Sequence, residues 1–215
     1  MAPRKYKLGK RAESVEQTRR RIVDAVVSLH GEKGVIATSV QDIAHRADVA
    51  VGTVLRHFPS LDDLIRACGS RIIEITKPPK PEVFSGRDSV AERIEILVQE
   101  LFAFYERAAR WLQAGRSERD RVPLLDERLR HLEQGLESLV RECLGPAGSD
   151  DRVVLAAIAL TDFPVWKALR GRGMTYGAAA ALIGELLTSW VERITAREDE
   201  RQGTETKHLT DQAKS

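Results

Sequence analysis

Apolar residues recur at steps of three and four along most of the chain, and this spacing predicts a protein built from helices. Over residues 15–33 apolar Ile22, Ala25, Val26 and Leu29 recur at three- and four-residue steps. An α-helix completes a turn every 3.6 residues, so these side chains share one face. We expect an amphipathic helix that ends at the glycines following it.

A pair of short helices is expected next in the chain. Ser39 followed by Asp42 matches a capping box, and apolar residues then repeat at helical spacing for about two turns. Asp48 and Val49 form the break, since aspartate tolerates the left-handed backbone conformation better than most residues. A second short helix begins near Ala50. Two short helices joined by a tight turn form a helix-turn-helix.

Longer helices follow, separated by prolines and glycines. Ser60 caps a helix that ends near Thr76, and prolines then break the chain up to residue 87. Later apolar stripes predict helices over residues 89–112, 123–144, 151–170 and 175–197, with Pro164 as a kink in the third. Residues 202–215 hold one leucine among polar residues, so we expect a disordered tail there.

Composition places the chain among globular proteins. With 215 residues and 42% hydrophobic content it can bury a real core, and 31% of its residues are charged. No apolar run approaches the roughly 20 residues that span a membrane, and the amino terminus lacks an apolar signal core. We therefore expect a soluble cytoplasmic protein without a membrane partner.

Positive charge is concentrated at the amino terminus. Residues 1–21 carry eight basic and two acidic side chains, a net +6, which leaves −4 for the remainder of a chain whose total is +2. This charge lies beside the helix-turn-helix in sequence, where it would meet phosphates. The basic arm of residues 1–14, with Arg4, Lys5 and Lys7, either enters an adjacent minor groove or is a solvated tail.

Signals of catalysis are absent from the sequence. It has no glycine-rich phosphate loop and no nucleophile elbow, and its five histidines lack metal-ligand spacing. Cys68 and Cys143 fall in different predicted helices, and buried thiols are favoured over a disulfide or a redox switch. We expect neither enzymatic activity nor a cofactor.

The helix-turn-helix resembles the amino-terminal DNA-binding domain of the TetR family of bacterial transcriptional regulators. The matching residues, in the family's order and spacing, are Ile43, Ala44, Ala47, Val49, Gly52, Thr53, His57, Phe58 and Leu64. Asp48 departs from the usual glycine and Ala50 from the usual capping serine. Leu55 replaces a tyrosine that commonly touches a phosphate, and Leu61 replaces a common lysine, which leaves two phosphate contacts of the family in question.

The resemblance and the chemistry of the side chains together select the DNA-binding candidates. Gln41 lies on the first turn of the first short helix and can pair with adenine through two hydrogen bonds. Gly52 and Thr53 lie near the start of the recognition helix, and this amino-terminal end is the part that enters the major groove. The full set is Ser39, Gln41, Val51, Gly52, Thr53, Arg56 and His57, together with Arg4, Lys5 and Lys7 of the arm.

The resemblance also implies a second domain that binds a small molecule and dimerises. Its ligand-binding candidates are the aromatic residues Phe102, Tyr105, Trp111, Phe163 and Trp166, for which plain core packing is the alternative. Small residues in the final two helices suit a four-helix interface between two copies, and ordinary packing within one chain is again the alternative. Glu127 and His131, one turn apart, fit a surface pair better than a pocket feature.

Together these features predict an all-α fold with an N-terminal three-helix helix-turn-helix domain and a C-terminal helical ligand-binding and dimerisation domain. The expected divisions are an arm (1–14), the helix-turn-helix domain (15–59), a connecting helix (60–76), a linker (77–87), the effector-binding and dimerisation domain (88–201) and a tail (202–215). The expected function is a homodimeric repressor that binds a palindromic double-stranded DNA operator and is released by a small-molecule effector. The alternative is a helical ligand-binding or interaction protein without sequence-specific DNA recognition.

Overall fold

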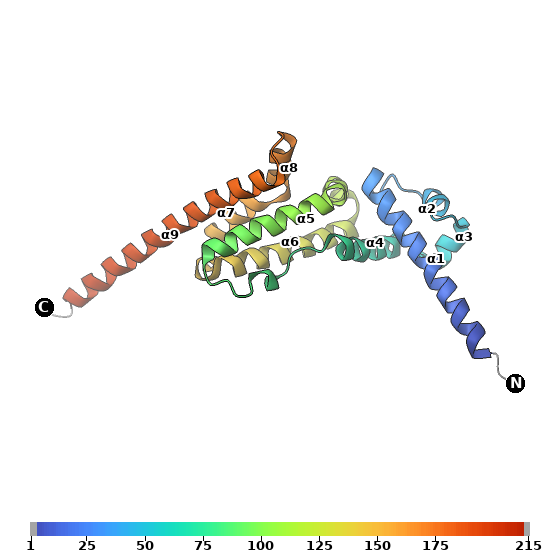
Figure 1. The fold of residues 1–215 in the computed structure, drawn as a ribbon, viewed down its shortest axis with the longest axis horizontal. Coiled ribbons are helices and arrows are strands. Elements are labelled where there is room, and N and C mark those ends of the chain that lie inside the picture. Colours follow the sequence, from blue (N-terminus) through green and yellow to red (C-terminus); the bar gives the residue numbers. More distant parts are fainter. Residues whose placement is uncertain (1–3, 213–215) are drawn as a thin grey trace. The chain divides into compact units, whose positions relative to one another are not determined.

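The regular structure of the chain is helical. The computed structural model describes the backbone of residues 4–212 and the side chains of residues 12–197. Within those residues the elements are α-helices and short 3-10 helices, and there is no strand (Figure 1). The predicted all-α class is therefore confirmed.

Helices follow one another with short connections. In chain order they are α1 (Arg4–Lys33), α2 (Val40–Arg46), α3 (Val51–His57), α4 (Leu61–Thr76), η1 (Pro81–Phe84), α5 (Val90–Glu118), η2 (Arg119–Arg121), α6 (Pro123–Leu144), η3 (Gly145–Ser149), α7 (Asp151–Thr161), α8 (Phe163–Gly171) and α9 (Tyr176–Gln212). The chain divides into two compact units. The first runs to Lys77 and includes Arg107–Glu133, whereas the second comprises Pro78–Glu106 and the chain from Gln134 onward.

The first unit has a core formed by the apolar stripes that the sequence predicted. Helix α1 packs against α2 and α4, and α2 packs against α3 (Figure 1). The core is lined by Ile22, Val26, Leu29, Ile43, Ala44, Ala47, Val54, Phe58, Leu64 and Cys68, all buried. Burying each of these larger apolar side chains contributes about 1.5–3 kcal/mol relative to leaving it exposed. The three-helix arrangement of the helix-turn-helix is held by this core.

Both ends of α4 are defined by local chemistry. The hydroxyl of Ser60 accepts a hydrogen bond from the backbone N–H of Asp63, and the Asp63 carboxylate accepts one from the backbone N–H of Ser60. At the other end Lys77 takes a left-handed conformation with φ of 46°. The prolines that follow prevent further helix, because proline lacks an N–H and restricts the residue before it.

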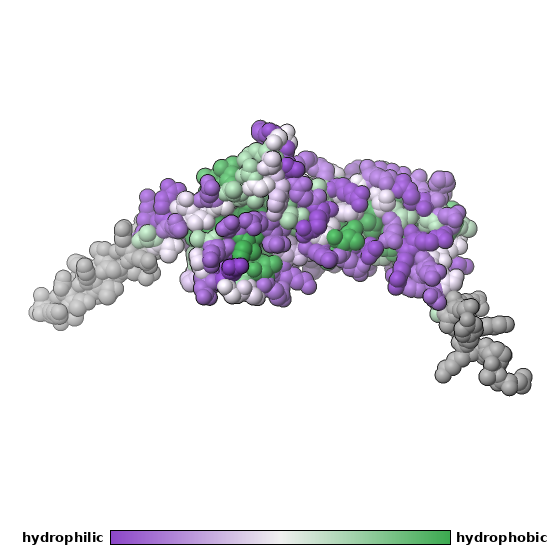
Figure 2. Space-filling model, viewed as in Figure 1, coloured by the Kyte–Doolittle hydropathy of each residue, from purple (hydrophilic) through white to green (hydrophobic). Residues whose placement is uncertain are grey.

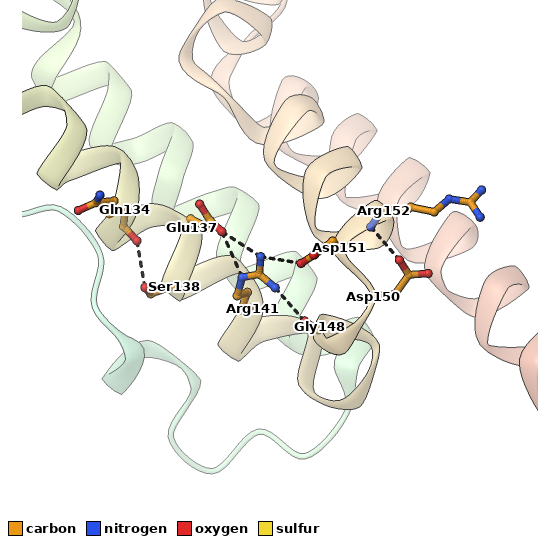
Figure 3. A network of polar contacts seen from close by, with 8 residues as sticks. All are labelled: Gln134, Glu137, Ser138, Arg141, Gly148, Asp150, Asp151 and Arg152. Carbon is orange, nitrogen blue, oxygen red and sulfur yellow. Dashed lines mark hydrogen bonds and ion pairs between the residues drawn. The ribbon is translucent and has the colours of Figure 1, made fainter. Parts of the chain in front are cut away.

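An arginine joins three elements of the second unit. Arg141, in the last turn of α6, contacts Asp151 at the start of α7 at 2.9 Å and Glu137 of its own helix at 3.0 Å (Figure 3). It also donates to the carbonyl oxygen of Gly148 in η3 at 3.2 Å. The side chain thereby fixes the turn between α6 and α7.

The structure corrects the expected single helix over residues 151–170. Helix α7 ends at Thr161 and α8 begins at Phe163, with the intervening Asp162 in an extended conformation. The Asp162 carboxylate accepts a hydrogen bond from the backbone N–H of Phe163 at 2.7 Å. Pro164 therefore lies in the first turn of a new helix, where a missing N–H costs nothing, rather than at a kink inside one.

The outermost helices extend further than the sequence pattern predicted. Helix α1 begins at Arg4 instead of residue 15, and α9 continues to Gln212 instead of ending near residue 197. The added segments hold few apolar residues, but they are rich in lysine, arginine, glutamate and glutamine, which have high helix propensity. Apolar periodicity alone therefore misses such extensions. The other domain boundaries stay predictions.

The face of the molecule drawn in Figure 2 is mainly polar. Hydrophilic residues cover most of the face drawn in Figure 2, and apolar residues gather in small patches. Among the described residues, none of the helices has the length and apolar content needed to cross a membrane.

Candidate nucleic-acid interface

Helix α2 starts at a complete capping box. The Ser39 hydroxyl accepts a hydrogen bond from the backbone N–H of Asp42 at 3.1 Å, and the Asp42 carboxylate accepts the backbone N–H of Ser39 at 2.9 Å. Lys33 reaches the same carboxylate at 2.7 Å. The hydrogen bonds that the Asp42 carboxylate accepts from Lys33, and then from the hydroxyl and backbone N–H of Ser39, hold its pKa below the usual range. The predicted start of the helix-turn-helix is confirmed.

The turn between α2 and α3 is fastened by α1. Asp48 adopts the left-handed conformation with φ of 51°, as the sequence predicted. The guanidinium of Arg21 donates to the carbonyl oxygen of Ala47 at 2.6 Å and to that of Asp48 at 2.5 Å. These bonds satisfy carbonyls that the end of α2 leaves without helical partners. Arg21 therefore has a structural role in holding the turn between α2 and α3.

Helix α3 presents a bare outer face. Only Val54 of its seven residues is buried, and Ala50 at its start offers no side-chain cap. Val51 is 36% exposed and Leu55 is 47% exposed. The space beside Gly52 is empty, since no described atom outside its immediate surroundings lies within 4 Å of where a Cβ would stand. The exposed half of α3 can thus approach another molecule closely.

The remaining DNA-binding candidates differ in their exposure. Gln41 and Arg56 are exposed, whereas Thr53 and His57 are half-buried. Ser39 is exposed, but its hydroxyl also donates to the Asp42 carboxylate at 2.7 Å, so capping already engages it. The side chains of Arg4, Lys5 and Lys7 lie outside the described residues.

Several other cations of this unit are already paired. Arg46 binds Glu32 through two hydrogen bonds of 2.8 and 2.9 Å, which together with the hydrogen bond from Ser28 lower the pKa of Glu32 to about 2. Arg20 lies 3.4 Å from Glu16, and the guanidinium of Arg19 lies 5.1 Å from the centre of the Phe58 ring. In contrast, no ion pair is formed by Arg56 among the described side chains. Arg56 is thus a cation of α3 that remains available.

Helix α5 supports the helix-turn-helix from behind in a way that the sequence analysis missed. The buried Glu118 carboxylate accepts hydrogen bonds from the backbone N–H groups of Val35 at 2.7 Å and Ile36 at 3.3 Å. The Trp111 indole N–H donates to the carbonyl oxygen of Val27 at 2.8 Å. The sequence around Glu118 and Trp111 gave no sign of these contacts, because their hydrogen-bond partners lie more than 80 positions away in the chain.

The sequence of this region matches known DNA-binding proteins. Residues 22–68 match the family model described as bacterial regulatory proteins of the tetR family. The transcriptional repressor KstR of Mycolicibacterium smegmatis is 38% identical over 63 residues, which is 29% of this chain and 31% of that protein. KstR of Rhodococcus jostii is 41% identical over 59 residues, or 27% of this chain and 28% of that protein.

The chain thus contains a helix-turn-helix region of the TetR family over residues 22–68. It spans less than a third of the length of either KstR protein, so this sequence likeness concerns their helix-turn-helix region. The match begins at Ile22 and ends at Cys68, both core residues of the first unit.

Solved structures of transcriptional regulators share the fold of most of the chain. FadR of Bacillus subtilis, in complex with stearoyl-CoA, aligns with a TM-score of 0.61 and 18% identity over 78% of this chain and 96% of that one. A putative transcriptional regulator of Saccharomonospora viridis, in complex with choline, aligns with a TM-score of 0.62 and 17% identity over 82% of this chain and 96% of that one. At these identities the likeness shows the fold, including the helical part that follows the helix-turn-helix.

The aromatic residues that the TetR resemblance suggested for ligand binding do not all meet. Tyr105 lies 5.6 Å from Phe163 and 6.0 Å from Trp166 between ring centres, and Phe102 lies 6.3 Å from Tyr105. These four are buried in the second unit. Trp111 belongs to the first unit, where it serves the Val27 contact.

One polar atom in this aromatic cluster has no partner. The indole N–H of Trp166 is buried without a hydrogen bond, although such groups are nearly always paired in folded proteins. Cys143, in the same unit, is a buried free thiol whose pKa is raised to about 12 by burial, and Cys68 of the first unit behaves alike. Both thiols therefore stay protonated, as expected for core cysteines.

Proposed function

We propose that the protein is a ligand-responsive transcriptional repressor that binds a palindromic DNA operator as a homodimer. The observation that carries the proposal is the outer face of α3, where exposed Val51, Gly52, Leu55 and Arg56 follow a turn fixed by Arg21. A helix held at its base and bare on its outer side fits the major groove. The KstR relatives, which match in this region, are named as repressors.

Dimerisation is supported by apolar side chains of the second unit. Leu182 and Leu186, four residues apart on α9, are 38% and 51% exposed, and Leu155 on α7 is 65% exposed. Helices α7 and α9 pack against each other. A second copy would cover these leucines, and a dimer that binds a palindrome needs its two recognition helices at half-sites about 34–36 Å apart.

An effector site is supported by the cluster of Tyr105, Phe163 and Trp166. Aromatic side chains with one unpaired donor suit an apolar or aromatic molecule that carries a hydrogen-bond acceptor. The structural relatives that hold stearoyl-CoA or choline bind small molecules on the same fold. To release the operator, the effector must bind the released form more tightly than the DNA-bound form.

The decisive experiment is selection of bound sequences from a random DNA pool by the full-length protein at near-physiological salt. We expect an enriched palindrome, because a two-fold dimer presents two identical α3 helices. An intact helical dimer that enriched no sequence would contradict the proposal and favour a ligand-binding protein without DNA recognition.

A glycine pair provides matched variants for this experiment. Gly52 on α3 and Gly135 on α6 both have empty space where a Cβ would stand. We expect Gly52→Ala to fold normally but to lose at least tenfold in operator affinity, because the added methyl keeps the backbone away from the bases. Gly135→Ala should bind as the unaltered protein does. Equal affinities of the two variants would remove α3 from the interface.

A further inference from the structure

The outer face of α3 consists of two neighbouring stripes. Val51 and Leu55 are four residues apart and form an apolar stripe, and Gly52 and Arg56 form the second. Residues at this spacing share a helix face, one turn above the other. All four are exposed. The helix thus offers hydrophobic and cationic surface side by side.

The exposure of the two apolar residues is not explained by packing within the protein. Val54 and Phe58 fill the core beneath α3, whereas Leu55 stays 47% exposed. Leu55 also lines a cavity of about 110 Å³ together with His30, Pro59 and Leu61. Leu61, at the start of α4, is 49% exposed. An apolar partner would cover surface that water now meets.

The charge of α3 indicates which partner fits. The helix has no acidic residue, and Arg56 and His57 occupy its last turn. A surface that combines apolar side chains with positive charge complements a polyanion that also displays apolar groups. In the major groove the apolar group is the C5 methyl of thymine, which lies beside the acceptor and donor atoms of the base edges.

We propose that Val51 and Leu55 select the operator by contacting thymine methyl groups, which rests on the function proposed above. Gly52 lets the backbone approach the groove, so that both side chains reach its floor. Arg56, on the adjacent stripe, lies where it meets a phosphate or a guanine of the same half-site. At the position of Leu55 the TetR resemblance leads one to expect a tyrosine that contacts a phosphate. Leucine cannot make that hydrogen bond, and in this proposal it contacts a base instead.

The test replaces single thymines of the selected operator by deoxyuridine, which removes the methyl group and leaves base pairing unchanged. With the unaltered protein we expect one or two positions in each half-site to lose about fourfold in affinity each, the effect of exposing one methyl-sized group. The remaining thymines should tolerate the replacement. This part of the experiment needs no variant, so protein folding cannot affect it.

Variants then assign the positions to side chains. Leu55→Ala should bind the thymine and uridine forms equally at one sensitive position, and Val51→Ala should do so at another. Ile73→Ala is the matched control, since Ile73 is 46% exposed, close to the value for Leu55, but lies on α4 and outside the cavity that Leu55 lines. It should retain the uridine sensitivity of the unaltered protein.

Two results would separate this inference from the function on which it rests. Methyl reading is overturned, and the repressor proposal stays intact, if the selected palindrome has no thymine at the bases that α3 contacts. The same holds if no uridine replacement changes the affinity of the protein for the palindrome. Failure to select any sequence overturns both.

Discussion

At the scale of single residues, His30 is a buried titratable group near the carboxyl end of α1. Its side chain is 5% exposed, and burial lowers its pKa from 6.5 to about 4. In the unfolded chain the imidazole takes up a proton as the pH falls through about 6.5, whereas in the folded protein it does so only near pH 4. Between pH 6.5 and pH 4 the unfolded state therefore binds more protons than the folded state, so the folded state loses stability as the pH is lowered.

This difference gives a measurable pH dependence. Between pH 6.5 and 4 we expect His30 to cost the folded state up to about 3 kcal/mol, from roughly 1.4 kcal/mol per pKa unit. Urea unfolding at pH 7 and pH 5 measures the part of this effect that lies above the ordinary pKa values of carboxyl groups. His30→Gln, which cannot be protonated, should show a flatter dependence. An equal loss of stability in this variant would assign the dependence to other groups.

At the scale of elements, α3 lacks the side-chain cap that α2 and α4 both have. Ala50 supplies no side-chain cap, while α2 and α4 each begin with a serine and an aspartate that cap reciprocally. Ala50→Ser restores the missing hydroxyl at a position whose backbone is already extended, with φ of −70° and ψ of 147°. We expect a gain of about 0.5–2 kcal/mol in stability and slower hydrogen exchange in α3. Unchanged exchange would show that α3 is held by Val54 and Phe58 alone.

Elements and their local caps were predictable from sequence because their signals lie within a few residues. Ser39 with Asp42, the left-handed Asp48 and the stop after Thr76 are all decided by neighbours in the chain. Arg21 and Glu118 were not predictable as structural residues, since Ala47 and Val35, their partners, meet them only in the folded chain. The break between α7 and α8 at Asp162 was missed because a proline in the first turn of a helix and a proline at a kink inside one give the same local sequence pattern.

At the scale of the whole molecule, α5 belongs to both compact units, and Glu118 is its most buried charged residue. Glu118→Ala leaves the backbone N–H groups of Val35 and Ile36 without an acceptor. We expect a loss of about 1–3 kcal/mol in stability and weaker operator binding, because the segment preceding α2 loses its anchor. Glu127→Ala, at an exposed position of α6, is the control and should be silent. Equal stability of both variants would contradict an anchoring role.

The last prediction concerns the dimer, since binding to both halves of a palindrome needs two α3 helices. Replacing both Leu182 and Leu186 by glutamate puts two charges on the exposed apolar face of α9, so we expect a folded monomer that has lost operator binding at nanomolar to micromolar concentration. Gln134→Glu with Ser138→Glu, also four residues apart and exposed, adds the same charge to α6 and should leave the dimer intact. Sedimentation velocity measures the assembly, and circular dichroism checks the fold. A dimer that survives the α9 substitutions would move the interface elsewhere on the molecule, whereas a monomer that still bound the full palindrome tightly would remove dimerisation from the mechanism.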